Sequence, residues 1–141
     1  MELESAHILV IDDDPHMFNL IKFYLSSEPY KLEWAKNGRH ALHILQDHSF
    51  DMILLDVLMP EMDGITLIKH LKDRYNSNTI IILVTAHGPE DHLMQTLKDG
   101  IHDILQKPFT ANRLKLTVRN GLKYKFLNEA YSRLKKATEK L

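Results

Sequence analysis

The sequence predicts an α/β fold in which helices cover both faces of one parallel sheet. Short apolar runs alternate with segments of helical periodicity along the chain, and this alternation is typical of parallel strands joined by crossover helices. The chain has 141 residues, of which 44% are hydrophobic, so it is long enough to bury one core and too short for two ordinary domains. We therefore expect a doubly wound sheet built from five βα units.

Five segments have the length and composition of strands. The run at residues 80–84 is apolar at every position, which indicates a strand in the interior of the sheet. The run at residues 32–35 is short and mixed, which suits an edge strand. The full set of predicted strands is 8–11, 32–35, 52–55, 80–84 and the weaker 104–105.

The segments between the strands carry signals for the ends of helices. Asp14 followed by Pro15 predicts an N-cap and a first helical residue. Gly88 followed by Pro89 predicts the start of a fourth helix, and Gly100 predicts its end. Further N-caps are expected at Asn37, Asp63 and Thr110.

The C-terminal segment predicts one long helix with two apolar stripes. Residues 110–141 contain no proline and one glycine, Gly121, so a helix of about 30 residues is expected, far above the usual mean. One stripe repeats every four residues and is expected to lie against the sheet: Leu114, Val118, Leu122 and Phe126. The other has the spacing of a heptad seam: Tyr124, Leu127, Tyr131, Leu134, Thr138 and Leu141. An apolar seam of this kind usually packs against a partner.

Composition excludes several classes of function. The chain has no cysteine, which rules out disulfides, thiolate zinc sites and a cysteine nucleophile. It has no apolar stretch near 18 residues, and glutamates stand near its start where a secretory signal would carry lysine and a hydrophobic run. We expect a soluble, cytoplasmic protein that does not contact membranes.

The net charge of −1 hides two oppositely charged regions. Residues 1–112 hold 9 Lys and Arg against 17 Asp and Glu, whereas residues 113–141 hold 9 against 2. A basic segment can contact nucleic acid, an anionic membrane or an acidic partner. Aromatic or glycine-rich nucleic-acid signatures are missing, so we interpret the basic residues as a solvated helix face and expect no direct binding of nucleic acid.

Acidic residues follow two of the predicted strands directly. Asp12, Asp13 and Asp14 follow the first strand, and Asp56 follows the third. The carboxyl ends of parallel strands meet at one edge of the sheet, where ligands bind in this class of fold. Carboxylates a few Å apart repel each other by roughly 4 kcal/mol per pair at an effective dielectric of 20, so the cluster is unfavourable unless a cation or protons neutralise it. The sequence therefore predicts a site for a hard divalent metal.

Two further polar signals are expected at the same edge. Thr85 follows the fourth strand, and Lys107 with Pro108 follows the fifth. Carboxylates that hold Mg²⁺, a carboxylate nucleophile, a hydroxyl and an ammonium together indicate phosphoryl transfer to an aspartate. Trp34, on the expected edge strand, has no evident chemistry.

In this order the motifs resemble the receiver domain of bacterial two-component response regulators. The matching segments are residues 8–15 (ILVIDDDP), residues 51–64 (DMILLDVLMPEMDG), the Thr85-Ala86 pair and residues 107–109 (KPF), and the resemblance covers about residues 6–122. It implies a flavodoxin-like sheet of five parallel strands in the order 2-1-3-4-5, flanked by five helices of which the fifth is extended. It also implies a cis peptide bond before Pro108.

The resemblance implies a role for each site residue. Asp56 would be the phosphoacceptor, Asp13 a direct Mg²⁺ ligand and Asp12 a ligand through water. Leu58 would bind the metal through its backbone carbonyl. Thr85 would bond the phosphoryl group and Lys107 would pair with it, while for Asp14 we prefer a helix-capping role.

Three positions depart from or modify the family pattern. The fifth strand usually carries Tyr or Phe where this chain has Ile104, so the usual swing of an aromatic ring is not expected and the signal would travel through the loop after Thr85. Together with Thr85, we treat Ile104 and His87 as the switch positions. Leu58 should slow hydrolysis of the acyl phosphate by excluding water, whereas His87 could act oppositely as a base, and the sequence leaves this balance open.

The predicted function is a phosphorylation-controlled switch and not a turnover enzyme. A sensor histidine kinase or a phosphotransfer protein would donate the phosphoryl group to Asp56 in a Mg²⁺-dependent reaction. One alternative is an aspartyl-phosphate phosphatase of the haloacid dehalogenase kind, but such enzymes need a general acid two residues after the nucleophile, where this chain has Leu58. The other alternative is an inert interaction module. We expect a receiver domain at residues 1–122 and a helical extension at 123–141, a coiled-coil linker that pairs with its copy in a homodimer. The chain would be either the front part of a regulator with a C-terminal output domain or a stand-alone protein.

Overall fold

The computed structural model describes residues 6–56, 64–71, 78–86 and 101–140. Several sequence predictions fall on other positions and lie outside these residues. They are the cap at Asp63, the helix between Gly88 and Gly100, the metal ligand Leu58, the switch position His87 and the last seam residue Leu141.

The centre of the fold is a parallel sheet of five strands in the order β2-β1-β3-β4-β5, which confirms the predicted fold class and strand order. All residues of β3 and β4 are buried, whereas β2, with the mixed sequence KLEWA, is an edge strand. The strands are β1 (His7–Ile11), β2 (Lys31–Ala35), β3 (Met52–Leu55), β4 (Ile80–Thr85) and β5 (Asp103–Gln106).

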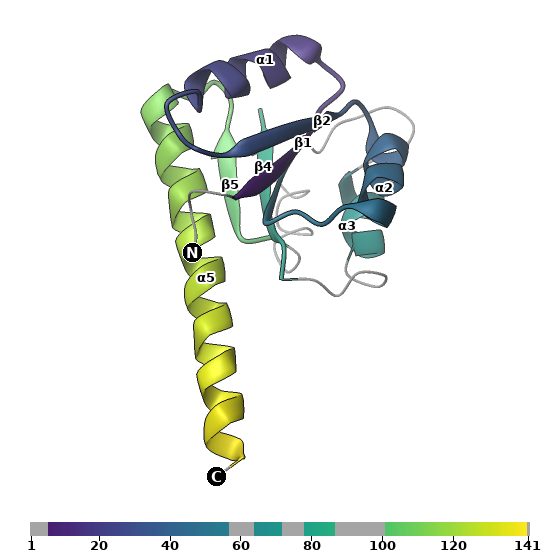
Figure 1. Ribbon diagram of the computed structural model, residues 1–141. Helices are drawn as coiled ribbons and strands as arrows, with labels where there is room; N and C mark the ends of the chain where they lie inside the picture. The colour runs from purple at the N-terminus through teal and green to yellow at the C-terminus, as the bar shows by residue number, and fades with distance from the viewer. Residues whose placement is uncertain (1–5, 57–63, 72–77, 87–100, 141) are drawn as a thin grey trace.

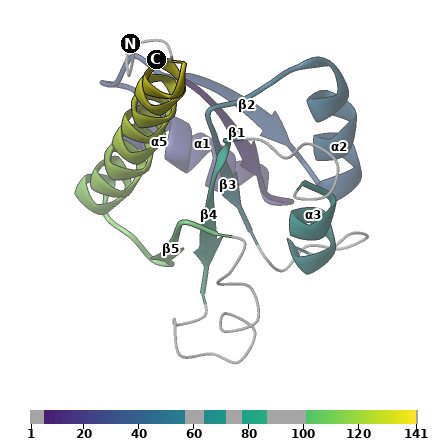
Figure 2. The same cartoon turned by 90° about the horizontal axis from the view of Figure 1, so that it is seen from below.

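Helices cover both faces of this sheet (Figure 1). The helices α1 and α5 lie on one face, and α2 and α3 lie on the other, as the view from below also shows (Figure 2). The described residues hold four helices where five were predicted, because the predicted fourth helix lies outside them. The four are α1 (Pro15–Tyr24), α2 (Gly38–Asp47), α3 (Gly64–His70) and α5 (Ala111–Glu139).

Three predicted N-caps are confirmed by their hydrogen bonds. The Asp14 carboxylate accepts the N–H of His16 at 2.9 Å, and Asn37 accepts the N–H of His40 at 2.8 Å. The Thr110 hydroxyl accepts the N–H of Arg113 at 3.1 Å and begins α5. Such a cap contributes about 1 kcal/mol to helix stability.

The first apolar stripe of α5 packs against the sheet as predicted. Leu114, Val118 and Leu122 are fully buried, and Phe126 packs against the same cluster. Gly121 lies at a close approach of α5 to the sheet, because a Cβ at this position would lie 2.7 Å from Cε of Met52. The glycine therefore allows the helix to lie close against β3 and β4.

The C-terminal part of α5 continues well beyond the sheet (Figure 1). The second stripe faces solvent along this part: Tyr124, Leu127, Tyr131 and Leu134 are 57 to 71% exposed. None of the helices in the described part of the chain combines the length and hydrophobicity needed to cross a membrane.

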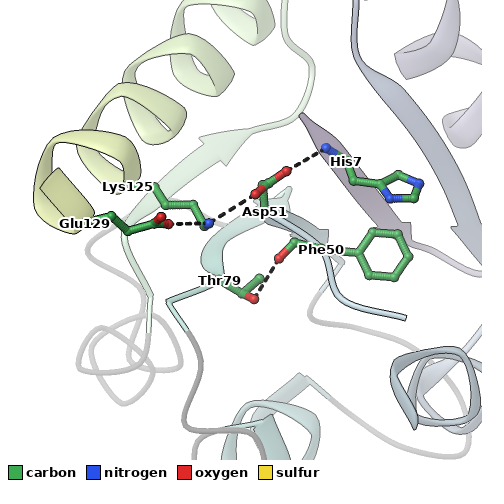
Figure 3. Close-up of polar contacts among 6 residues, drawn as sticks. All are labelled: His7, Phe50, Asp51, Thr79, Lys125 and Glu129. Carbon is green, nitrogen blue, oxygen red and sulfur yellow. Dashed lines mark hydrogen bonds and ion pairs between the residues drawn. The ribbon is translucent and has the colours of Figure 1, made fainter. Parts of the chain in front are cut away.

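A group of polar contacts joins α5 to the amino end of β3 (Figure 3). The Lys125 ammonium donates to Asp51 at 3.1 Å and to Glu129 at 2.6 Å. The other oxygen of Asp51 accepts the backbone N–H of His7 at 2.9 Å. These contacts fix the helix to β1 and β3 at the end of the sheet opposite Asp56.

Candidate functional site

Three carboxylates meet at the carboxyl ends of β1 and β3. The strands pair in register, with Ile11 opposite Leu55, so the residues that follow them lie side by side, and the N–H of Asp56 donates to the Ile11 carbonyl at 2.9 Å. One carboxylate oxygen from each of Asp12, Asp13 and Asp56 lies within 4.8 Å of the others. The structure therefore brings together the three acidic residues that the sequence placed at one edge.

Asp12 is the buried member of this cluster, with 2% of its surface exposed. Its Oδ1 accepts the N–H of Asp14 at 2.9 Å. Burial raises the pKa of the Asp12 carboxyl above its ordinary 3.8, the Asp14 N–H and the Lys107 ammonium oppose this, and the charges of Asp56 and Asp13 add to it. A positive charge in the cluster would relieve this cost.

Lys107 brings a positive charge to two of the carboxylates. Its Nζ lies 3.5 Å from Oδ2 of Asp12 and 3.7 Å from Oδ2 of Asp56. Its backbone N–H donates to the Thr85 carbonyl at 2.7 Å, which holds the loop after β5 against the end of β4. The peptide bond between Lys107 and Pro108 is cis, as predicted.

Thr85 and Ile104 lie on neighbouring strands of the same face. Thr85 is buried at the end of β4, two residues after Leu83, and therefore faces the side of the sheet that α2 and α3 cover. Ile104 pairs with Leu83 and is partly buried against the same cluster. The structure thus places both described switch positions on one face, beside the acidic edge.

The donor set of this site fits Mg²⁺. This ion takes oxygen ligands, keeps several waters and is usually held by one or two carboxylates. The exposure of Asp13 and the partial exposure of Asp56 leave room for such waters, while Asp12 lies beneath them. When bound, Mg²⁺ would neutralise charge on the carboxylates and on a phosphoryl group.

One contact of the site was missed by sequence reasoning. The indole Nε1 of Trp34 donates to the backbone carbonyl of Asp12 at 2.8 Å. The available signal was weak, since Trp34 only stands near the carboxyl end of an edge strand. The contact depends on the register of β1 with β2, which places Val10 opposite Trp34.

The fold and this arrangement of acids, threonine and lysine define a class of signalling domain. Residues 8–119 match the family described as the response regulator receiver domain. The chain belongs to this family, and to two-component regulatory systems.

Its relatives include transcriptional regulators and isolated receiver domains. The chain is 34% identical over 115 residues to the transcriptional regulatory protein SrrA of Staphylococcus aureus, covering 82% of this chain and 47% of SrrA. The signal receiver domain of a putative Luxo repressor protein from Vibrio parahaemolyticus is similar in structure, with a TM-score of 0.82, 29% identity and coverage of 90% and 97% of the two chains. NtrX from Brucella abortus, in complex with ADP, matches with a TM-score of 0.84 and 26% identity over 92% of this chain and 30% of NtrX.

The chain spans about half the length of the curated relatives it matches. What it shares with them is the receiver domain.

Proposed function

We propose that this receiver domain is a phosphorylation-controlled switch that accepts a phosphoryl group on Asp56. The convergence of Asp12, Asp13 and Asp56 with the Lys107 ammonium is the observation that carries this proposal. The donor is a phosphohistidine of a sensor histidine kinase or a phosphotransfer protein, and the reaction takes place in the cytoplasm.

The transfer is a displacement at phosphorus. A carboxylate oxygen of Asp56 attacks the phosphorus atom, an O–P bond forms as the N–P bond of the donor breaks, and the leaving imidazole takes up a proton from solvent. Asp13, Asp56 and the backbone carbonyl of Leu58 would hold the metal directly, and Asp12 would hold it through a water. The Thr85 hydroxyl donates to a phosphoryl oxygen, and Lys107 balances the charge that develops.

The switch couples the phosphoryl group to the end of β4. In this proposal the Thr85 hydroxyl moves toward the phosphoryl group, and the loop that follows moves with it. Because Ile104 is aliphatic and branched, it fills space beside Thr85 without the large ring swing of an aromatic residue. His87 and Leu58 set the lifetime of the phosphorylated state.

Incubation with Mg²⁺ and acetyl phosphate tests the phosphoacceptor. We expect a stable adduct on one aspartate in the wild type and none in Asp56→Asn, with the same far-UV circular dichroism for both. Asp47→Asn, which changes an exposed aspartate on α2, is the matched control and should react like the wild type. An equal adduct on Asp56→Asn would remove Asp56 from its role.

The same assay separates the other classes of function. Rapid multiple turnover of phosphate esters would indicate a phosphatase, and an unreactive wild type would indicate an inert interaction module. Lys107→Ala should still bind Mg²⁺ but show a weaker conformational response to phosphorylation. An unchanged response in that variant would contradict the role of Lys107.

For the output we propose a homodimer through the seam on α5. The seam residues that the structure describes are exposed. Fewer than three heptads are too short for a tight dimer, so the receiver at 1–122 adds surface to the linker at 123–141. A C-terminal output domain would follow, as the greater length of the relatives suggests. The basic tail repels its copy, so dimerisation should strengthen as salt screens this charge.

Sedimentation at low and moderate salt tests the dimer. We expect Leu134→Gln on the seam, and a chain that ends at Leu122, to be monomeric where the wild type dimerises. Lys136→Gln, an exposed position away from the seam, should dimerise at least as well. A dimer unaffected by loss of the tail would contradict this arrangement.

A further inference from the structure

The backbone of Asp12 is held on both sides by residues of β2. Its N–H donates to the Ala35 carbonyl at 3.1 Å, and its carbonyl accepts the indole N–H of Trp34 at 2.8 Å. The regular pairing of β1 with β2 ends at Ile11 and Ala35. The indole thus supplies a hydrogen bond to Asp12 at the point where the strand ladder stops.

This carbonyl belongs to the peptide unit that joins Asp12 to Asp13. Together with the φ and ψ angles on either side, the orientation of a peptide plane sets the directions in which the two flanking side chains leave the backbone. Both flanking side chains here are carboxylates of the acidic cluster. The Trp34 indole therefore acts on the geometry of two proposed metal ligands without touching the metal position.

The indole ring also packs against α1. Its ring stacks on Phe18 of α1, with centroids 5.8 Å apart and an interplanar angle of 16°. Asp14 caps α1, so the acidic turn at 12–14 is fixed by β2 at one end and by α1 at the other. Trp34 belongs to β2 and contacts α1 through Phe18.

We propose that Trp34 is a positioning residue that orients the peptide between Asp12 and Asp13 for binding of a divalent cation. The inference rests on the proposed function of the acidic cluster. It assigns to the only tryptophan of the chain a role beyond filling space between α1 and β2, and it places that role in the N–H group. The ring alone would serve packing, whereas the N–H serves the site.

Two substitutions at position 34 test the role of the donor. Trp34→Phe keeps an aromatic ring against Phe18 but removes the N–H, and Trp34→benzothienylalanine keeps the bicyclic shape and replaces the N–H by sulfur. Phe18→Leu is the matched control, because it weakens the stack and leaves the donor intact. Calorimetric titration with Mg²⁺ and thermal unfolding without Mg²⁺ are measured for each.

We expect both Trp34 variants to bind Mg²⁺ roughly two- to tenfold more weakly, the range that corresponds to one ordinary hydrogen bond. Phe18→Leu should lower the melting temperature and keep the wild-type affinity. With acetyl phosphate, the Trp34 variants should need more Mg²⁺ for half-maximal phosphorylation and reach the wild-type rate at saturation. A purely structural role would move the melting temperature in all three variants and the affinity in none.

Wild-type affinity in the benzothienylalanine variant would overturn the inference, as would an equal loss of affinity in Phe18→Leu. A wild type that binds no Mg²⁺ would overturn the proposed metal site and this inference with it. A wild type that binds Mg²⁺ but accepts no phosphoryl group would refute the proposed function alone, since the calorimetric comparison still stands.

Discussion

Replacing Lys125 by Met should measure how firmly α5 is fixed to the sheet. The Lys125 side chain is 12% exposed and donates to both Asp51 and Glu129 (Figure 3). Methionine keeps most of the aliphatic stem and loses the ammonium. Position 125 lies off the exposed seam, so the change should leave any pairing of the helices intact.

The expected loss follows from the two ion pairs. The bond to Glu129 is an i,i+4 pair between partly exposed groups and is worth roughly 0.3–0.5 kcal/mol. The bond to Asp51 is charge-assisted, and such bonds contribute roughly 1.5–3 kcal/mol, reduced here because Asp51 is 27% exposed. Together they predict that Lys125→Met lowers the free energy of unfolding by about 2 kcal/mol.

The pKa of Lys125 supplies an independent check. Burial lowers this pKa, but the hydrogen bonds to Glu129 and Asp51 and the negative charges of both carboxylates together outweigh burial and hold the pKa above the ordinary 10.5. The folded state therefore keeps its proton to higher pH than the unfolded chain. The stabilisation is fully present below pH 10.5 and is lost as the pH rises through the folded-state pKa.

Urea unfolding of Lys125→Met, Asp51→Asn and the double variant gives the coupling energy of the pair. We expect a coupling of about 1 kcal/mol or more, and Lys136→Met, at an exposed position of the same helix, should change stability by less than about 0.5 kcal/mol. A coupling below about 0.5 kcal/mol, the level of exposed surface pairs, would refute the view that this contact fixes α5.

Three other outcomes follow from the packing and charge of the fold. Gly121→Ala gains about 0.5–1 kcal/mol of helix propensity, but its Cβ would lie 2.7 Å from Cε of Met52, the movable end of that side chain, and 3.2 Å from Cγ2 of Ile80, whose branched side chain moves less readily. Overpacking costs roughly 1–3 kcal/mol, so chemical unfolding should show a net loss of about 1 kcal/mol, whereas Asn120→Ala should show no loss. Asp12→Asn keeps the acceptor for the Asp14 N–H. Because the raised pKa of Asp12 means that its ionisation above pH 3.8 destabilises the fold, the variant should be more stable than the wild type without Mg²⁺, as thermal unfolding with a chelator would reveal. The variant should also lose Mg²⁺ binding. Burial lowers the pKa of His102 below 6.5, so as the pH falls the imidazole takes up a proton in the unfolded chain before it does so in the folded protein. The free energy of unfolding should therefore fall as the pH drops below 6.5. A His102→Gln variant with the same pH dependence of stability as the wild type would contradict this.

Much of the fold could be predicted because its signals are local. The wholly apolar run of β4 marks a strand covered on both faces, and the mixed run of β2 marks an edge. Asp14, Asn37 and Thr110 each cap a helix through an N–H two or three residues away. Such features require only neighbouring residues, so the sequence contains them in full.

The acidic edge was also predictable, because parallel strands bring their carboxyl ends together whatever the intervening chain contains. Asp12, Asp13 and Asp56 therefore meet as soon as β1 and β3 are assigned as neighbours. The placement of Lys107 within 4 Å of two of these carboxylates required the full strand order, because three other elements, α3, β4 and β5, separate it from Asp56 in the described part of the chain.

Other contacts were decided by the tertiary structure alone. Hydrophobic periodicity states which face of an element is buried, but it does not state which atom lies opposite a given side chain. The bond from Trp34 to the Asp12 carbonyl, the ion pair between Lys125 and Asp51, and the close approach at Gly121 all join segments that are distant in sequence. Each depends on strand register and helix position to within about 1 Å, because hydrogen bonds and close packing fail beyond that tolerance.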